Sequence, residues 1–565
     1  MVLAQANLRL DANAIDYLLL AFYFTLVLGI GYLAKRQVST SLDFFLSGRS
    51  LPAWVTGLAF ISANLGAIEV MGMSANGAQY GMPTAHYFWV GAIPAMLFLG
   101  IVMMPFYYGS KVRSVPEFML RRFGKPAHLV NGISFATAQI LIAGANLFLL
   151  AKIVNVLLGW PIWLAIILAA VVVLTYTALG GLSAAIYNEV LQFFVIVAAL
   201  VPLTIVGLVK VGGWQGLVDK IGLAPGSQPD VNSWPGTNIT GFGSPFWSVV
   251  GLVFGLGFVL SFGYWTTNFV EVQRAMASKS MSAARRTPII GAFPKMFVPF
   301  IVIIPGMIAA VTVTELMGAN RTALVGDKSA PSGATFNDAL LLLMRDLLPN
   351  GMLGVALAGL LASFMAGMAA NLSSFNTVFS YDIWQSYIKK DRPDDYYLKL
   401  GRWVTAGGTI LAIGTAFIAS TYANLMDYLQ QLFSFFNAPL FATFILGMFW
   451  KRMTATAGWT GLVSGTLAAV GVFLLSETGA IDLPGQGASF VGAGAAFVVD
   501  IVVSVAVTYA TAPKPEAQLV GLVYSLTPKE TRQHSTTGED AGWYRNPALL
   551  AGIVLAITII LNIIF

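Results

Sequence analysis

The chain has 565 residues, of which 57% are hydrophobic and 10% are charged, with a formal net charge of +6. A soluble domain carries about 25% charged residues, so this composition excludes an ordinary soluble protein and indicates a surface that mostly faces lipid. Cysteine is absent, which excludes disulfides, thiolate metal sites and a cysteine nucleophile. Membrane-proximal loops account for the positive charge better than nucleic-acid binding does.

Apolar runs of membrane-spanning length follow one another along the whole chain. They fall near 14–34, 51–78, 83–108, 128–157, 160–178, 186–211, 246–275, 287–315, 350–385, 398–421, 424–449, 455–476, 487–511 and 545–565. Fourteen spans therefore account for most of the sequence, and no stretch between them is suited to a soluble domain. The chain is predicted to be a single transmembrane domain over 1–565.

Lysine and arginine concentrate in the loops that follow odd-numbered spans, with dense clusters at 111–125 and 273–286. The positive-inside rule places these loops in the cytoplasm and both termini outside it. The sequence therefore predicts an integral protein of the plasma (inner) membrane with extracytoplasmic termini.

One span is interrupted by polar residues. The run ISANLGAIEVMGM (61–73) carries Asn64, Gly66 and Glu69 in its middle. No water is available at that depth, so such residues usually face a bundle interior or a cavity. We predict a broken helix at a binding site.

A second stretch, VFGLGFVLSFGYWTTN (253–268), is weakened by glycine, serine and threonine at the corresponding place of the second half. Paired broken helices are typical of transporters built from inverted repeats. We predict a first repeat over 51–211 and a second over 246–449. An extra helix at 14–34 precedes them, and extra helices at 455–565 follow.

Few ionisable residues lie inside the spans. Lys152, Glu271 and Asp500 lie near predicted span ends, where a side chain can extend to the headgroups, and we expect no function for them. Glu69 and Lys295 lie deep in apolar runs, where opposite charges are tolerated if they pair or share a polar cavity. A structural ion pair and a functional site both remain open for these two.

Catalytic motifs are absent: the sequence has no nucleophile elbow, no HExxH and no phosphate-binding loop. An enzyme is therefore not expected, nor is an organic cofactor. A channel would be expected to show charged rings or filter loops, which are not found. A transporter-like sensor stays as the alternative from another class, although no soluble signalling domain is present.

Ordered sequence blocks extend through nearly the whole chain. They are DFFLSGRSLPAW (43–54), ISANLGA (61–67), VRSVPEFMLRRF (112–123), YTALGGLSAAIYNEVLQ (176–192), VQRAMASKS (272–280), KMFVPFIVIIPG (295–306), NTVFSYDIW (376–384) and LGMFWKR (446–452). In order and spacing these blocks resemble the solute:sodium symporter family, close to its sodium/sugar cotransporters. The resemblance implies an all-α polytopic membrane protein with a LeuT-like fold, two inverted five-helix repeats and about fourteen transmembrane helices.

The resemblance also implies a solute site. Its positions in this chain are Asn64, Glu69, Phe88, Ser261, Tyr264, Lys295 and Gln430. Asn64, Lys295 and Gln430 keep the residue types of the sugar transporters, and Tyr264 matches an inner gating tyrosine.

Three of these positions depart from the family pattern: Glu69 replaces a glutamine, Phe88 a glutamate and Ser261 an asparagine. Several hydrogen bonds to sugar hydroxyls are therefore missing, and galactose itself should bind poorly. A small neutral solute, a sugar or polyol, is the first expectation. A cationic or zwitterionic metabolite is the next.

The resemblance further implies a Na⁺ site between the first broken helix and a later core helix. Its expected positions are the backbone carbonyls of Ser62, Leu65 and Ser363 and the side chains of Ala366 and Gly367. The last two replace serines, so two side-chain oxygens are absent and the site should be weakened.

The acid near the family's cation path is present as Glu189. Three coupling schemes follow: Na⁺ at a shifted site, H⁺ carried by Glu69, or uncoupled transport. Family resemblance favours Na⁺. We therefore expect a secondary active symporter that works by alternating access, with Na⁺ or H⁺ as coupling ion and Glu69 and Glu189 as candidate coupling residues.

Overall fold

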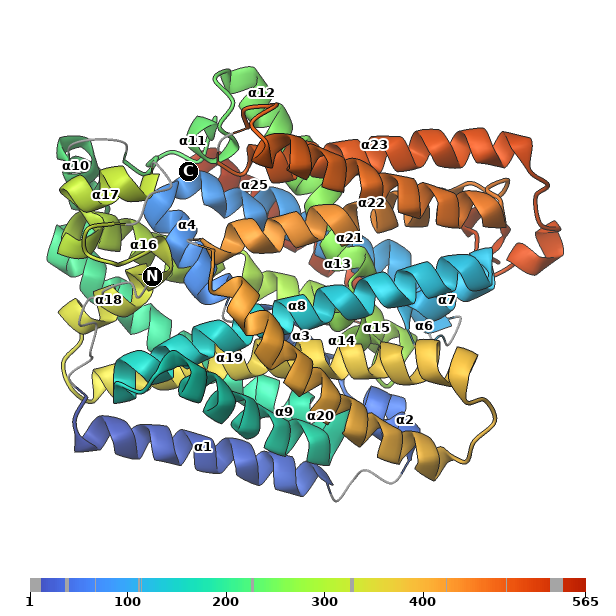
Figure 1. Ribbon diagram of the computed structural model, residues 1–565, viewed down its shortest axis with the longest axis horizontal. Coiled ribbons are helices and arrows are strands. Elements are labelled where there is room, and N and C mark those ends of the chain that lie inside the picture. Colours follow the sequence, from blue (N-terminus) through green and yellow to red (C-terminus); the bar gives the residue numbers. More distant parts are fainter. Residues whose placement is uncertain are drawn as a thin grey trace.

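The computed structural model describes residues 12–35, 40–66, 68–109, 112, 114–224, 228–325, 330–422, 424–483, 485–528 and 542–565. These residues form helices and loops, and the described chain has no β-strand. Most of the long helices lie along the longest axis of the molecule (Figure 1). Helix α1 (Ala14–Lys35) begins at the same end of the molecule as the C-terminus.

The described chain has twelve helices that are long and apolar enough to cross a membrane, and one bent helix pair that makes a further span. A shorter apolar segment, Ile162–Thr175, lies in α9 (Ile162–Val211), ahead of the span Leu182–Val211. The two crossings expected at 160–178 and 186–211 both fall within α9, and a second crossing by this helix stays a prediction. By length and composition the described helices supply twelve spans, or thirteen with the bent pair, so the chain is an integral membrane protein.

The first predicted break is confirmed. Helix α3 (Ala53–Asn64) ends at Leu65, and the chain continues as η2 (Ile68–Gly72) and α4 (Met73–Gln79), at 56° to α3. The rest of the first half comprises α2 (Ser41–Leu46), η4 (Tyr87–Ala92), α5 (Ile93–Phe98), η5 (Leu99–Met103), α6 (Met104–Gly109), α7 (Val115–Phe123), α8 (Lys125–Leu158), α9, α10 (Gly213–Leu223) and α11 (Thr237–Thr240).

The second break lies at Asn268, the last residue of the stretch expected to contain it. Asn268 has an extended backbone, and its side chain accepts a hydrogen bond from the amide of Val270, which caps the next helix. The second half comprises α12 (Pro245–Val250), η6 (Gly251–Ser261), α13 (Phe262–Thr267), α14 (Phe269–Met276), α15 (Met281–Lys295), α16 (Val298–Thr312), α17 (Gly318–Val325), α18 (Ala339–Leu347), α19 (Met352–Thr377), η9 (Val378–Ile388), α20 (Asp394–Ala419) and α21 (Leu425–Phe449). In the described chain after α21, the α-helices are α22 (Ala455–Glu477), α23 (Gly487–Ala510) and α25 (Pro547–Ile564).

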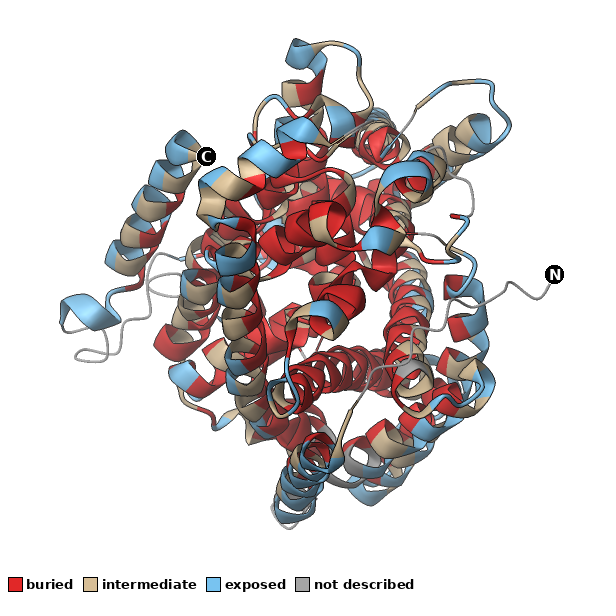
Figure 2. Ribbon diagram, turned by 90° about the vertical axis from the view of Figure 1, so that its left-hand side faces the viewer, coloured by how far each residue is buried: buried red, intermediate tan, exposed pale blue. Residues whose placement is uncertain are grey.

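Burial separates the core helices from the peripheral ones. Nearly every residue of α19 is buried, whereas α1 and α25 bury few of theirs and expose large apolar side chains such as Leu18 and Ile563. Figure 2 shows buried residues gathered in the middle of the molecule and exposed ones around it. Exposed apolar side chains on peripheral helices are stable in a lipid environment.

The expectation that Lys152, Glu271 and Asp500 extend to the headgroups is wrong. Lys152 pairs with Asp338, at 2.6 Å between Nζ and Oδ1. Glu271 and Asp500 are fully buried, and the Asp500 carboxylate accepts a hydrogen bond from the Thr443 hydroxyl at 2.7 Å. Asp338 and Thr443 come from distant parts of the chain, which the order of spans does not reveal.

Candidate functional site

A pocket lies where the two helix breaks meet in the middle of the bundle. It has an empty volume of about 770 Å³, a figure that includes space open to solvent. Residues of α3, η2, α8, α13, α19 and α21 line it. Six of the seven expected solute-site residues are among them: Asn64, Glu69, Ser261, Tyr264, Lys295 and Gln430.

The two deep charges form an ion pair in this pocket. The Lys295 ammonium lies 2.5 Å from Glu69 Oε1 and also donates a hydrogen bond to the side-chain oxygen of Asn64. Lys295 ends α15, and Pro299 at the start of α16 helps to end the helical hydrogen bonding there, because proline has no amide hydrogen. The chain break thus lets the lysine reach the first repeat, and the pair leaves the pocket without net charge.

Phe88 is the expected solute residue that does not line the pocket. It is buried, and the Lys295 ammonium lies 4.6 Å from the centre of its ring and 5.3 Å from that of Trp265. A cation over an aromatic face is attracted by the ring's quadrupole. Phe88 therefore contacts the Lys295 ammonium from outside the pocket and does not face a solute in this conformation.

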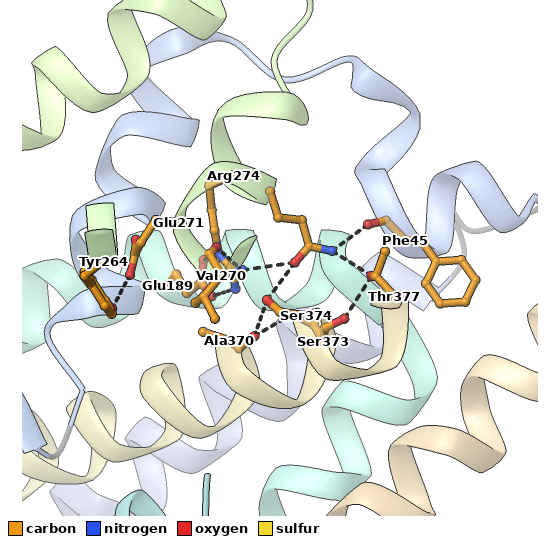
Figure 3. A network of polar contacts seen from close by, with 11 residues as sticks. Phe45, Glu189, Tyr264, Val270, Glu271, Arg274, Ala370, Ser373, Ser374 and Thr377 are labelled. Carbon is orange, nitrogen blue, oxygen red and sulfur yellow. Dashed lines mark hydrogen bonds and ion pairs between the residues drawn. The ribbon is translucent and has the colours of Figure 1, made fainter. Parts of the chain in front are cut away.

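Tyr264 connects the two breaks. Its hydroxyl accepts a hydrogen bond from the Asn64 amide at 3.0 Å and donates one to Glu271 Oε1 at 2.8 Å. Figure 3 shows Tyr264 and Glu271 beside each other, joined by this hydrogen bond. Movement of this ring breaks both hydrogen bonds, so the position is suited to a gate.

The expected cation positions lie where α3 faces α19. The Ser363 hydroxyl donates to the carbonyl of Leu65, the residue that ends α3, at 2.5 Å. Gly367 lines the pocket and faces Gly66 closely, while Ala366 is buried beside it. Leu65, Ser363 and Gly367 are thus brought together at the break.

Ser62, the remaining expected cation position, is fully buried in α3. Within the described chain its hydroxyl has no hydrogen-bond partner. Its carbonyl lies in the last turn of α3, where backbone oxygens lack helical partners.

Comparison with known proteins identifies the family. The model of the sodium:solute symporter family matches residues 44–465, which is most of the chain. The chain belongs to the sodium:solute symporter family. The sodium/glucose cotransporter of Vibrio parahaemolyticus is 29% identical over 481 residues, covering 81% of this chain and 85% of that protein. Sodium/glucose cotransporter 1 of Ovis aries is 28% identical over 561 residues, covering 94% and 83%.

The fold of this symporter is also that of a solved structure, a substrate-bound, outward-open Na⁺-coupled sialic acid symporter. The TM-score is 0.73 at 21% identity, over 89% of this chain and 99% of that one. The expected LeuT-like fold with two inverted five-helix repeats is confirmed, and family and fold are those of transporters. The repeat limits 51–211 and 246–449 stay predictions.

Glu189 of this symporter lies outside the pocket, in an ion pair with Arg274. The two side chains are fully buried, with 2.6 Å between Arg274 Nη2 and Glu189 Oε1. Arg274 also donates to the carbonyl of Val270 and to Gln273, and the network continues to Ser374 on α19 (Figure 3). The acid expected near the cation path is therefore engaged by a cation of the protein itself.

A polar cluster ties α4, α21 and the start of α23 together beyond Tyr87, which lines the pocket. Gln486 accepts a hydrogen bond from the Tyr87 hydroxyl and donates to Asp427 Oδ1 at 2.7 Å. Asn424 donates to Asn76 Oδ1 at 2.9 Å. These contacts join helices from both repeats at that end of the symporter.

Sequence reasoning missed Asn146, which lines the pocket from α8. It carries no charge and lies inside a long apolar run, so a search for ionisable residues passes over it. An asparagine in such a run is itself a signal, because its amide must find partners in the bundle.

Proposed function

We propose that this chain is a secondary active symporter that couples entry of Na⁺ to uptake of a small, neutral, polar solute, of the sugar or polyol class. The solute occupies the pocket lined by Asn64, Glu69, Tyr264, Lys295 and Gln430. The observation that carries the proposal is the position of this pocket at both helix breaks of an inverted-repeat transporter fold. Transporters of this architecture bind solute and ion at such breaks.

The charges of the pocket support a neutral solute. Glu69 and Lys295 neutralise each other, so neither a lone anion nor a lone cation meets an opposite charge that is free to pair with it. The amide of Gln430, the carboxylate of Glu69 and the ammonium of Lys295 are groups that can bind hydroxyls. A zwitterion, whose two charges can pair separately with Glu69 and Lys295, is the second candidate. The uptake experiment described below includes such a solute.

Transport by alternating access requires a gate on each side of the pocket. Tyr264, joined to Asn64 and Glu271, is suited to one of them. The cluster around Gln486 and Asp427 is suited to the other. We place the symporter in the plasma (inner) membrane with both termini extracytoplasmic, from the distribution of Lys and Arg between loops.

Uptake into proteoliposomes tests the proposal. The purified chain is given labelled glucose, a polyol, a zwitterionic amino acid and an organic cation, with inward gradients of Na⁺ or of H⁺ imposed separately. We expect a sugar or polyol to accumulate only under the Na⁺ gradient. Accumulation under the pH gradient with indifference to Na⁺ would contradict Na⁺ coupling.

The variant Glu69→Gln decides the proton alternative. If Glu69 carries the proton, the variant loses accumulation driven by the pH gradient and keeps only equilibration. Under the proposal the wild-type chain shows no such accumulation. Glu69→Gln then weakens solute binding, because Lys295 loses its partner, but whatever uptake remains follows Na⁺.

A further inference from the structure

Asn146 presents an oxygen to the break of α3. The Asn146 side chain is 3% exposed, and its amide nitrogen donates to the Ile142 carbonyl at 3.2 Å. This hydrogen bond fixes which way the amide points, so the oxygen faces away from its own helix turn. Among the described residues that oxygen has no hydrogen-bond partner, which is costly for a buried polar atom.

The oxygen points at the contact between Gly66 and Gly367. A Cβ atom added to Gly367 would lie 2.9 Å from Asn146 Oδ1, and one added to Gly66 would lie 3.1 Å from it. The same Cβ on Gly367 would lie 2.9 Å from the Cα of Gly66. The Asn146 oxygen therefore occupies the space beside position 367 that a side chain there would need, and the two glycines let the helices approach.

The break supplies further oxygens around this point. Leu65 ends α3, and its carbonyl is turned to the Ser363 hydroxyl of α19 at 2.5 Å. The C-terminal end of a helix carries partial negative charge, and unwound carbonyls at such ends bind cations in transporters. A helix end, a hydroxyl and an unpartnered amide oxygen thus come from three different helices.

We propose that Asn146 is a side-chain ligand of the coupling Na⁺, together with the Leu65 carbonyl and the Ser363 hydroxyl. The proposal rests on the proposed Na⁺ coupling and supplies the side-chain oxygen that Ala366 and Gly367 cannot.

The oxygens named are uncharged, and the pocket's own carboxylate, Glu69, is held by Lys295. The cost of removing an ion from water rises steeply with its charge, so neutral dipoles suit a monovalent cation better than a divalent one. Calcium and magnesium sites use carboxylates. The site is therefore assigned to Na⁺.

Thermal unfolding of the purified full-length chain in detergent tests this without a known solute. A ligand that binds only the folded state raises the melting temperature with its concentration. NaCl is titrated against choline chloride at constant ionic strength. For the wild type we expect saturable stabilisation by Na⁺, and for Asn146→Ala a midpoint at least about tenfold higher, which corresponds to about 1.4 kcal/mol.

Asn131→Ala is the matched control. Asn131 lies on the same helix, is 2% exposed and has a side-chain oxygen with no hydrogen-bond partner among the described residues, but it lies 15 residues earlier, about 22 Å along the helix. We expect this variant to keep the wild-type Na⁺ midpoint. An equal shift in both variants would show a general effect of losing a buried asparagine and would overturn the proposal.

Asn146→Asp keeps an oxygen at the site and adds negative charge, so its Na⁺ midpoint should fall below that of the wild type. This variant decides the question if Asn146→Ala does not fold. Opposite shifts in the two variants are not expected of a structural role. An unchanged Na⁺ midpoint in either folded variant contradicts the proposal, and an accompanying loss of solute affinity at saturating Na⁺ makes Asn146 a solute ligand instead.

The same titration distinguishes failure of the proposed Na⁺ coupling from failure of the Asn146 assignment. If the wild-type chain itself gains no stability from Na⁺, the proposed Na⁺ coupling fails whatever Asn146 does. If the wild type responds and Asn146→Ala responds equally, only the ligand assignment fails.

Discussion

At each helix break, polar groups need hydrogen-bond partners outside a regular helix, and the two breaks supply these partners in different ways. At the second break, Asn268 forms its hydrogen bonds with residues that are close in sequence. Its side chain accepts a hydrogen bond from the Val270 amide, and its backbone amide donates one to the Tyr264 carbonyl. At the first break, the Leu65 carbonyl accepts from Ser363 on a different helix, and the Asn146 oxygen beside it has no partner in the described chain.

This difference teaches that an inverted repeat need not use its two breaks equally. The second break is closed by its own cap and positions Tyr264 in the pocket. At the first break, the oxygen atoms of Leu65, Ser363 and Asn146 face the space between α3 and α19. Substitutions at the first break should therefore change Na⁺ dependence, and those at the second should change stability or solute binding.

Loss of the lysine should have the largest effect. Lys295→Met leaves Glu69, just after the first break, without its partner in a pocket that is mostly buried. Removing one member of a buried pair destabilises by about 3–5 kcal/mol. We expect the melting temperature of the purified protein to fall and uptake to be lost.

The double variant Glu69→Gln/Lys295→Met is the control for that prediction. It removes both charges, so most of the lost stability should return while solute uptake does not. If uptake returns with stability, the pair is only structural and its place in the solute site is wrong.

The second-largest effect is expected from adding a side chain at the close contact of the first break. In Gly367→Ala the new methyl group meets the Cα of Gly66 at 2.9 Å, so α3 and α19 must separate. Such overpacking costs about 1–3 kcal/mol. We expect Na⁺-driven uptake to require at least about fivefold more Na⁺, since 1 kcal/mol corresponds to about that factor.

Gly132→Ala, on α8, is the comparison for Gly367→Ala, because the nearest atom to its added methyl group lies 3.7 Å away. This variant should behave as wild type. A Gly367→Ala protein with unchanged Na⁺ dependence would show that the contact between the two glycines is not part of the ion path.

Tyr264→Phe keeps the ring but loses the hydroxyl that joins Asn64 to Glu271. An unpaired buried polar group costs about 1–3 kcal/mol. We expect the solute concentration for half-maximal uptake to rise at least about fivefold, with the Na⁺ midpoint unchanged. A shifted Na⁺ midpoint with normal solute affinity would reverse the roles of the two breaks.

The smallest effect is expected from loss of the Asn268 cap of α14 at the second break. Asn268→Ala removes a helix cap worth about 1 kcal/mol, and Asn546→Ala removes the equivalent cap of α25, far from the pocket in sequence. Both variants should lose similar stability in thermal unfolding. Neither should change the Na⁺ midpoint, and a change in Asn268→Ala alone would show that the second break also binds the ion.

Much of the fold was predictable because membrane helices must satisfy their backbone internally, so apolar runs and their interruptions follow directly from the residue order. Both breaks were found from glycine and polar residues within spans. Glu69 and Lys295 were recognised because charge at depth is rare. Their pairing with each other remained one of two possibilities, since it depends on residues 226 positions apart.

What the sequence could not show are contacts between uncharged or distant residues. Glu189 was expected to serve a cation path, but its partner Arg274 lies 85 positions away. Phe88 was expected in the solute site and lies behind Lys295. Asn146 was not recognised at all, because its proposed role depends on Gly66 in the first break and Gly367 of α19, which both approach it.

The central claim is coupling between solute and Na⁺, and the most direct measurement is Na⁺ movement driven by solute. Proteoliposomes containing the purified chain, with equal Na⁺ on both sides, receive an inward gradient of the transported sugar or polyol. Coupling is reciprocal, so radioactive Na⁺ should accumulate inside against its own gradient until the solute gradient dissipates. Solute entry with no net Na⁺ movement would contradict the account.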